Sequence, residues 1–346
     1  MKDTIIKSNK KISLILKKKL LVGFLLLSLP FFTSSCKPKI EPISKTSFML
    51  NTVVQVTLYD SNDPTLIDDV FALCQEYENL LSKTIETSEV SKLNNRKEGE
   101  TTHSLSPVLE EILQKGLYYS QISHGGFDIT IGGVSNLWDF TSDTFILPTD
   151  TEIKKQLPSV GYEKIKIENH EITFLDPNTK IDLGAIAKGY IADKMKEELL
   201  SKGVKSAIIN LGGNVLCIGS KPDGTPFNIG LAKPFEDRSE TVGTLQISDA
   251  TVVSSGVYER NHFVDGVNYH HLLDPKSGYP IRNQLTAVTI ITKNSIDGDG
   301  LSTTCFSLGL EEGMNLINSL DDTYGVFITD DGQLHYSEGA EALLSQ

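Results

Sequence analysis

The sequence predicts an α+β fold, and three observations support this prediction. Strand-like and helix-like segments both occur along the 346 residues, without the regular alternation that a doubly wound parallel sheet requires. Hydrophobic residues make up 39% of the chain, which is enough for a packed core. No Pro/Gly-rich linker interrupts the sequence after residue 45. We therefore expect a single domain over residues 46–346.

The first half of this domain starts with a strand and two helices. Residues 48–59 are rich in Val and Thr, which favours a strand. Asp63-Pro64 and Ser106-Pro107 are typical helix starts, and apolar residues at helical spacing follow each of them. These helices should end near Leu81 and before Gly125-Gly126. Residues 164–167 and 172–175 predict a hairpin.

The second half alternates strands with two further helices. A helix over 186–200 ends at Gly203, and a second is expected over 300–308. Gly212-Gly213 separates two strand segments as a tight turn would. The strands expected in this half are 206–211, 215–218, 227–231, 241–247, 251–253, 287–291 and the closing hairpin 325–329 and 334–336.

The N-terminal segment has the pattern of a secretory signal. Seven lysines precede an apolar run over 20–32, and small residues then precede Cys36. This arrangement resembles a bacterial lipobox, which implies a lipoprotein signal peptide over 1–35 and lipidation of Cys36. Residues 36–45, with Pro38 and Pro42, are then expected to be a tether. We expect a protein anchored to the cell membrane that faces the periplasm or the exterior; the alternative is an uncleaved signal anchor.

Charge and cysteine content exclude several classes of protein. Removing residues 1–35 lowers the net charge from −13 to −19, so non-specific nucleic-acid binding is not expected. A phosphate-bearing ligand would need a metal ion, backbone N–H groups or a placed lysine. The four cysteines show no CxxC spacing, which gives no support to a zinc site or a disulfide scaffold.

Two glycine-containing segments suggest ligand binding. In Gly125–Gly132, paired glycines allow a ligand to approach the backbone, Phe127 offers a ring and Asp128 an acceptor; the alternative is a helix cap followed by a turn. In Ile181–Tyr190, a strand leads into a helix whose first N–H groups and Lys188 suit a phosphate. The alternative there is an ordinary strand–helix junction.

Two later segments suggest proton transfer and cation binding. His270 and His271 precede the turn Asp274–Gly278, and histidine exchanges protons near neutral pH; alternatively one is a core and one a surface residue. Asp299 and Thr303 lie four residues apart, hence on one helical face, and their oxygens suit Mg²⁺. Alternatively, Asp299 only caps the helix.

The order and wording of these segments resemble the ApbE family of FAD:protein FMN transferases. The resemblance rests on TSEVSKLN, GGFDITIGG, LWDF, DLGAIAKGY, INLGGN, SSGVYER, HHLLDPKSGYP and DGDGLST, and spans about 45–340. It implies a Mg²⁺-dependent transfer of FMN from FAD to a threonine or serine of a target protein, with release of AMP. The target implied is a subunit of a membrane redox complex.

The resemblance also implies roles for individual residues. His271 and Lys188 correspond to functional residues of the catalytic site, and His271 is the expected base. The metal ligands implied are Ala185, through its carbonyl, Asp299 and Thr303, with Ser302 nearby. The FAD contacts implied are Met49, Gly126, Phe127, Asp128, Asp182, Lys188 and Leu273. The chain departs from the family at Thr84, where many members carry an aromatic residue.

Two other functions fit the same residues. A Mg²⁺-dependent FAD pyrophosphatase would use water in place of the protein hydroxyl and yield FMN and AMP. A lipid-anchored protein that binds flavin without catalysis belongs to a different class.

Overall fold

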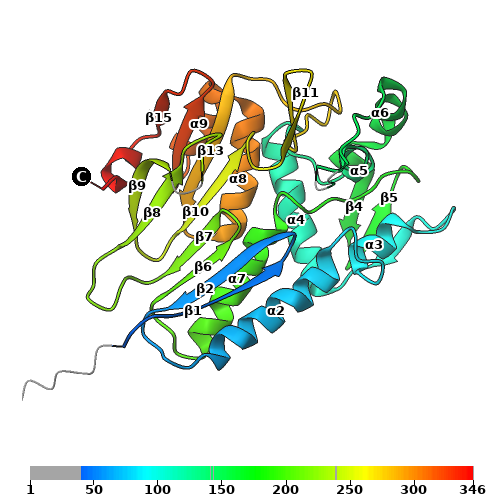
Figure 1. The fold of residues 1–346 in the computed structure, drawn as a ribbon. Coiled ribbons are helices and arrows are strands. Elements are labelled where there is room, and N and C mark those ends of the chain that lie inside the picture. Colours follow the sequence, from blue (N-terminus) through cyan, green and yellow to red (C-terminus); the bar gives the residue numbers. More distant parts are fainter. Residues whose placement is uncertain (1–39, 141, 143, 238–239, 346) are drawn as a thin grey trace, which may run out of the picture. The chain divides into compact units, whose positions relative to one another are not determined.

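A large antiparallel sheet organises the chain. The computed structural model describes residues 40–345 except 141, 143 and 238–239 (Figure 1). Neighbouring strands of the sheet all pair antiparallel. From edge to edge they are β1 (Ile43–Met49), β2 (Thr52–Leu58), β6 (Ala207–Leu211), β7 (Asn214–Ile218), β10 (Thr251–Gly256), β13 (Leu285–Thr292), β14 (Tyr324–Thr329) and β15 (Leu334–Tyr336).

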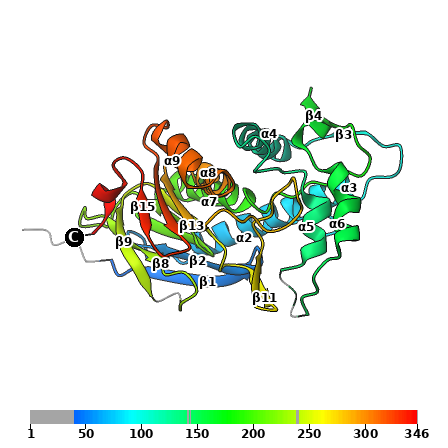
Figure 2. The same ribbon diagram turned by 90° about the horizontal axis from the view of Figure 1, so that it is seen from above.

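Helices pack on one face of this sheet and a hairpin packs on the other (Figure 2). The helices on the sheet are α2 (Thr65–Leu81), α7 (Ala187–Ser201), α8 (Ser295–Leu308) and α9 (Leu310–Asn318), and α4 (Pro107–Ile122) packs on α8. The hairpin consists of β8 (Phe227–Ala232) and β9 (Thr241–Ile247). Because both faces are covered, all eight residues of β13 are buried, which explains its continuous apolar and Thr sequence.

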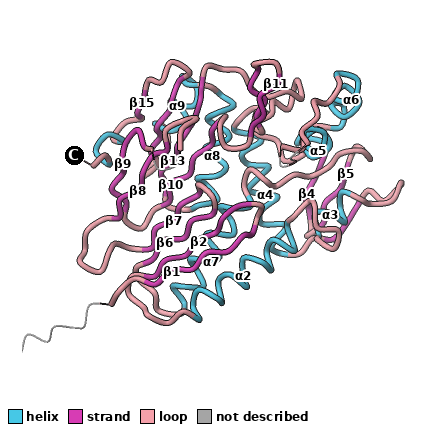
Figure 3. The backbone as a smooth tube through the Cα atoms, in the orientation of Figure 1, coloured by secondary structure: helices cyan, strands magenta, loops and turns pink. Residues whose placement is uncertain are grey.

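Shorter elements complete the chain (Figure 3). A three-stranded sheet and a two-stranded ribbon accompany short helices, and Trp138 anchors a small aromatic core. These elements are α3 (Glu89–Asn94), β3 (Thr102–Ser104), α5 (Gly132–Trp138), α6 (Asp150–Gln156), η1 (Leu157–Ser159), η2 (Tyr162–Lys164), β4 (Ile165–Glu168), β5 (Glu171–Phe174), β11 (Asn261–Val264), β12 (Val267–His270) and η3 (Ala340–Leu343).

The α+β prediction is confirmed, and three element predictions are wrong. The strand expected at the start of Ile181–Tyr190 is absent from the described residues, where only an isolated bridge pairs Lys180 with Ile131. Residues 48–59 do not form one strand, because Leu50 and Asn51 take φ values of 55° and 54° and turn the chain between β1 and β2. The helix expected over 300–308 begins at Ser295. Its glycines suggest a loop, but Gly298 packs against Val253 and Gly300 against the ring of Tyr119, so both serve close helix packing.

The N-terminal segment is described only from residue 40 onwards. Residues 1–35 and Cys36 lie outside the described residues. Strand β1 begins at Ile43, so the last three residues of the expected tether belong to the sheet. Among the described residues, no helix combines the length and the apolar character needed to cross a membrane.

Candidate active site

Helices α7 and α8 cross at the candidate site, and a glycine allows their close contact. A Cβ atom at Gly189, in the first turn of α7, would lie 2.2 Å from the carbonyl oxygen of Ser295 at the start of α8. Non-bonded atoms do not approach so closely, so a larger residue would push the helices apart. The crossing brings the DLGAIAKGY and DGDGLST segments together.

Asp299 is the buried carboxylate of this crossing. Its Oδ2 accepts a hydrogen bond from the backbone N–H of Gly189 at 2.6 Å, and its Oδ1 accepts one from Asn214 Nδ2 at 2.9 Å. Burial raises the pKa of Asp299, an effect that the positive charge of Lys188 and these two hydrogen bonds only partly oppose. A carboxylate held in this way is stabilised by any cation that reaches it.

Asn214 fixes the direction of the Asp299 carboxylate. Its side-chain oxygen accepts a hydrogen bond from Ser295 Oγ at 2.7 Å, so its NH₂ group is the end that faces Asp299. Asn214 is only 1% exposed. The sequence offered one signal for this residue, because Asn214 ends the INLGGN segment, but it gave no role.

Lys188 lies close to both Asp299 and His271. Its charge lowers the pKa of the Asp299 carboxyl and that of the His271 imidazole. Lys188 is half-buried, and within the described part of the chain its ammonium forms no hydrogen bond or ion pair. The ammonium group is therefore available to an anionic ligand at the start of α7, as the sequence predicts.

His271 is a neutral imidazole at physiological pH. Burial lowers its pKa to about 3, and the positive charges of Arg260 and Lys188 contribute. Its Nδ1 atom is buried without a hydrogen-bond partner among the described residues, and its backbone N–H donates to the Arg260 carbonyl at 3.1 Å. A neutral ring with a free nitrogen can accept a proton from a hydroxyl that is brought to it.

The other predicted metal ligands lie along the same crossing. Ala185 is exposed in the turn before α7, and Thr303 is half-buried one turn beyond Asp299 on α8. Ser302 instead has a structural role, because its hydroxyl donates to the Asp299 carbonyl at 3.0 Å and lies 2.8 Å from Ser255 Oγ.

This donor set fits a magnesium ion better than a transition metal. No group of three or more His, Cys, Asp or Glu side chains gathers anywhere in the described chain. Mg²⁺ commonly takes one or two carboxylates and completes its octahedron with waters and substrate phosphates. One buried carboxylate at Asp299 matches that requirement, and the Thr303 hydroxyl, one turn along α8, and the Ala185 carbonyl, in the turn before α7, would supply further oxygen ligands.

Asp182 carries its charge in a different environment. Its Oδ2 lies 2.7 Å from Lys83 Nζ and accepts a hydrogen bond from Ser135 Oγ at 2.6 Å, while its Oδ1 accepts the Gly184 N–H at 2.9 Å. Burial alone would raise the pKa, but Lys83 and these hydrogen bonds outweigh it and lower the pKa to about 2. Asp182 is therefore ionised and shapes the turn before α7.

Sequence reasoning missed Lys83 and Ser135. Lys83 directly precedes Thr84, the position where the family aromatic is replaced, yet no local pattern links it to a carboxylate 99 residues away. Thr84 itself is exposed, and its hydroxyl lies 3.0 Å from Ser82 Oγ.

The side chains of the Gly125–Gly132 segment mainly pack and form hydrogen bonds within the protein. The Phe127 ring is only 2% exposed and packs against Tyr119 at 5.9 Å, so it has a structural role in the core, and its contact with FAD stays a prediction. Asp128 is 8% exposed, and its two oxygens accept hydrogen bonds from Thr130 and from the Tyr162 N–H. Gly126 is half-exposed and packs against Ser307 of α8, where a Cβ would meet Oγ at 2.4 Å.

Met49 and Leu273 reach the site region from the core. Met49 is 7% exposed at the end of β1, next to the turn whose Asn51 carbonyl accepts a 3.5 Å hydrogen bond from Arg260. Leu273, 8% exposed, packs in the Trp138 cluster two residues after His271. Their predicted contacts with FAD stay predictions.

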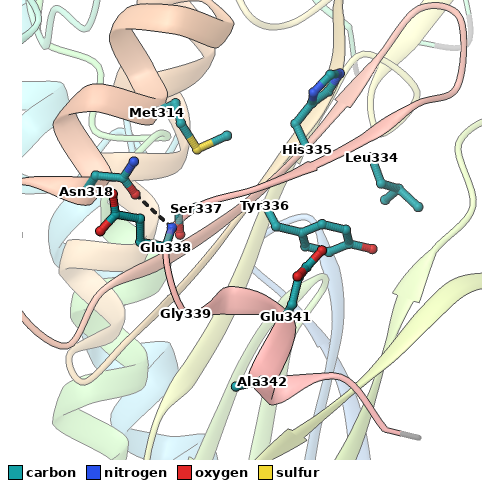
Figure 4. Close-up of a pocket in the computed structure, with 10 residues that line it drawn as sticks. All are labelled: Met314, Asn318, Leu334, His335, Tyr336, Ser337, Glu338, Gly339, Glu341 and Ala342. Carbon is teal, nitrogen blue, oxygen red and sulfur yellow. Dashed lines mark hydrogen bonds between the residues drawn. The ribbon is translucent and has the colours of Figure 1, made fainter.

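A separate hollow between α9 and the C-terminal segment does not serve this chemistry (Figure 4). Its ten lining residues run from Met314 and Asn318 to the 334–342 segment and include neither Lys nor Arg. Its acidic residues, Glu338 and Glu341, would repel a phosphate. The candidate site is therefore the α7–α8 crossing.

Comparison with known proteins agrees with the arrangement of these segments. The ApbE family profile matches residues 50–328. The chain belongs to the ApbE family. It is 34% identical to an FAD:protein FMN transferase of Klebsiella pneumoniae over 288 residues, which cover 83% of this chain and 89% of that protein. It is 27% identical to an FAD:protein FMN transferase of Treponema pallidum, with coverage of 88% and 89%.

Solved structures of ApbE proteins share the fold. The ApbE protein of Thermotoga maritima superposes with a TM-score of 0.80 at 27% identity and covers 88% of this chain and all of that one. The flavin transferase ApbE of Vibrio cholerae gives 0.79 at 26% identity, with coverage of 88% and 99%. The family prediction made from the motifs is confirmed, and the chain is an enzyme of the transferase class.

Proposed function

We propose that this ApbE-family enzyme is an FAD:protein FMN transferase that moves FMN from FAD to a threonine or serine hydroxyl of another protein and releases AMP, with Mg²⁺ required. The observation that carries the proposal is the grouping of Asp299, Lys188 and His271 at the α7–α8 crossing. An unbalanced buried carboxylate, an unpaired ammonium and a neutral imidazole are the groups that this reaction needs.

The diphosphate of FAD is the charged part that the site must hold. The Lys188 ammonium attracts phosphate oxygens at the start of α7, and the helix dipole adds to this attraction. The backbone N–H groups of Ala187 and Gly189 contribute less, because they already donate to the Leu183 carbonyl and to Asp299. Asp299, Thr303 and Ala185 would hold Mg²⁺, which when bound offsets the negative charge that develops on the phosphates.

The transfer exchanges the phosphoanhydride bond of FAD for a phosphoester bond to the acceptor. The hydroxyl oxygen of the acceptor attacks the phosphorus of the FMN half, and the bond from that phosphorus to the AMP oxygen breaks. His271, neutral in the resting site, accepts the hydroxyl proton, a role worth roughly 10²–10⁴-fold in rate. Lys188 neutralises charge on the leaving phosphate, and AMP departs with the bonding electron pair.

The cellular setting is also part of the proposal. A lipobox-like cysteine at 36 suggests lipidation and anchoring to the membrane, with the domain in the periplasm or outside the cell. An acceptor that belongs to a membrane redox complex would fit this location. The body of the chain is strongly acidic, so neither reactant is expected to be a nucleic acid.

One incubation tests the reaction. The purified protein is mixed with FAD, Mg²⁺ and a candidate acceptor, and the products are separated by gel electrophoresis and chromatography. We expect an acceptor band that is fluorescent because FMN is covalently attached, and one molecule of AMP for each molecule of labelled acceptor. Free FMN with AMP and no labelled band would instead identify a pyrophosphatase, and FAD binding without AMP release would identify a flavin-binding protein.

A further inference from the structure

Helix α8 is capped by a residue of α7. The residue at its own N-cap position, Asn294, makes no side-chain capping hydrogen bond. Instead, Asp193 Oδ1 accepts the N–H of Ser295 and Asp193 Oδ2 accepts the N–H of Ile296, both at 2.8 Å. A carboxylate on the first free N–H groups of a helix is stabilising because it also faces the positive end of the helix dipole.

Two contacts, one helical turn apart, therefore fasten α7 to α8. Gly189 and Asp193 are four residues apart on α7, and Ser295 and Asp299 are four residues apart on α8, so each pair spans about 6 Å. The Gly189 N–H binds Asp299 at one point, and Asp193 binds the Ser295 N–H at the other. A shift of α8 along α7 would break both contacts together.

A third link joins the same residues through Asn214. Ser295 donates its backbone N–H to Asp193 and its hydroxyl to Asn214, and Asn214 in turn donates to Asp299. Ser295, Asn214 and Asp299 are 0%, 1% and 5% exposed. Within this network Asp193 controls where α8 starts, and therefore where the Asp299 carboxylate lies.

We propose that Asp193 is a positioning residue for the cation. Both of its oxygens are committed to the α8 N–H groups, so it acts by fixing Asp299 in the geometry that the cation and the FAD diphosphate require. This inference rests on the proposed function and deepens it. It predicts that cation affinity depends on a carboxylate that does not touch the cation.

The test is Asp193→Asn. The amide retains one acceptor oxygen, but its NH₂ group faces the second N–H, so half of the cap is lost. We expect the Mg²⁺ concentration for half-maximal transfer to rise about tenfold, in line with the loss of groups that orient metal ligands. The KM for FAD at saturating Mg²⁺ should stay within about twofold of wild type, because binding groups such as Lys188 are unchanged.

A second readout does not depend on turnover. Mn²⁺ binding in the presence of ADP, followed by electron paramagnetic resonance, should weaken by the same factor of about ten in Asp193→Asn. Where this variant does not fold, Ser295→Ala replaces it, because it removes the hydroxyl that orients Asn214 and leaves the backbone cap intact. A smaller loss of Mn²⁺ affinity is expected there.

Asp60→Asn is the matched control. Asp60, like Asp193, is half-buried and accepts a backbone hydrogen bond, because its Oδ2 lies 2.8 Å from the Lys205 nitrogen. It follows the C-terminal end of β2, whereas the β1–β2 turn lies at the other end of that strand. It should lose stability without losing cation affinity. Wild-type Mn²⁺ affinity and Mg²⁺ dependence in both Asp193→Asn and Ser295→Ala would overturn the inference and leave Asp193 as a helix cap alone. A wild-type enzyme that transfers FMN equally well in metal-free buffer would overturn the magnesium role itself.

Discussion

Asp299 is a buried carboxylate and Asp182 a largely buried one, and both lie near the start of α7 in environments that differ in one respect. Asp182 is paired with the Lys83 ammonium, and its pKa is lowered to about 2. Asp299 receives only an amide and a backbone N–H as direct partners, and its pKa is raised by burial. The first charge has an ammonium group in direct contact, whereas the second has only the charge of Lys188 nearby, without an ion pair among the described residues.

This difference separates a structural carboxylate from a binding one. A buried charge without an opposite charge costs free energy, and a cation that arrives from outside recovers that cost. The Asp182 charge is therefore stabilised by the protein itself, whereas the Asp299 charge reaches its most stable state only with a bound cation. The contrast leads to four predictions, ordered from the largest expected effect to the smallest.

Asp299→Asn should have the largest effect, because it removes the carboxylate charge that the cation is expected to bind. The amide has the same shape and no charge, so we expect transfer to fall by at least about 1,000-fold, the equivalent of roughly 4 kcal/mol of transition-state stabilisation. Removal of the buried charge is stabilising, but the new NH₂ group faces either the Gly189 N–H or the Asn214 NH₂ group, so one hydrogen bond is lost and the melting temperature in EDTA should change little. A variant that keeps its Mg²⁺-dependent rate would show that the cation binds elsewhere.

His271→Ala should separate chemistry from binding at the same site. Loss of the proton acceptor should lower kcat by about 100-fold while FAD affinity changes little. Single-turnover transfer and fluorescence titration with FAD measure the two quantities. Equal transfer rates in the variant and the wild type would remove His271 from the mechanism.

Lys83→Met should turn Asp182 into a second unbalanced carboxylate. The side chains of Lys83 and Asp182 are 24% and 16% exposed, so the pair is largely buried and its disruption should cost about 3 kcal/mol of unfolding free energy. Urea denaturation measures this loss. Adding Asp182→Asn should restore most of it, and a double variant as unstable as the single one would contradict the charge argument.

His270 should give the smallest effect, as a dependence of stability on pH. Its Nε2 lies 3.2 Å from the Ile281 carbonyl and must donate there, so the buried Nδ1 is an unpartnered acceptor. Burial, with the charge of Arg282, lowers the pKa to about 4. Because the folded form resists protonation while an unfolded histidine titrates near 6.5, this contribution to stability is present above pH 6.5 and is lost as the pH falls towards 4.

His270→Gln should remove this pH-dependent contribution to stability and keep a hydrogen-bond donor for the Ile281 carbonyl. Between pH 7 and pH 5 the wild type should lose about 2 kcal/mol more unfolding free energy than the variant. Parallel urea titrations at the two pH values measure the difference. Identical losses in both proteins would show that His270 is protonated in the folded state.

Local sequence patterns predicted the α+β class, the long helices and the segments that form the site. Their success has a physical basis, since apolar periodicity, helix starts and glycine pairs act over a few residues, and Asp299 and Lys188 lie in such segments. The residues that complete the site act across long sequence separations. Lys83 pairs with Asp182, Asn214 orients Asp299, and Asp193 caps α8 from α7, 102 residues before Ser295.

The error at α8 has the same origin. The sequence predicts a start five residues late because Gly298 and Gly300 weaken the helix pattern, whereas the packed protein needs glycine at both positions. Contacts with Val253 and Tyr119, both far away in the sequence, override the local preference.

The crossing of α7 and α8 also makes the candidate site depend on residues near the end of the chain. The turn before α7 and the Asn214 amide precede α8 in the sequence, whereas Asp299 comes with α8. A chain truncated before Ser295 would keep that turn and lose the carboxylate expected to hold the cation. Proteolysis or premature termination before α8 therefore leaves a protein that cannot complete the site.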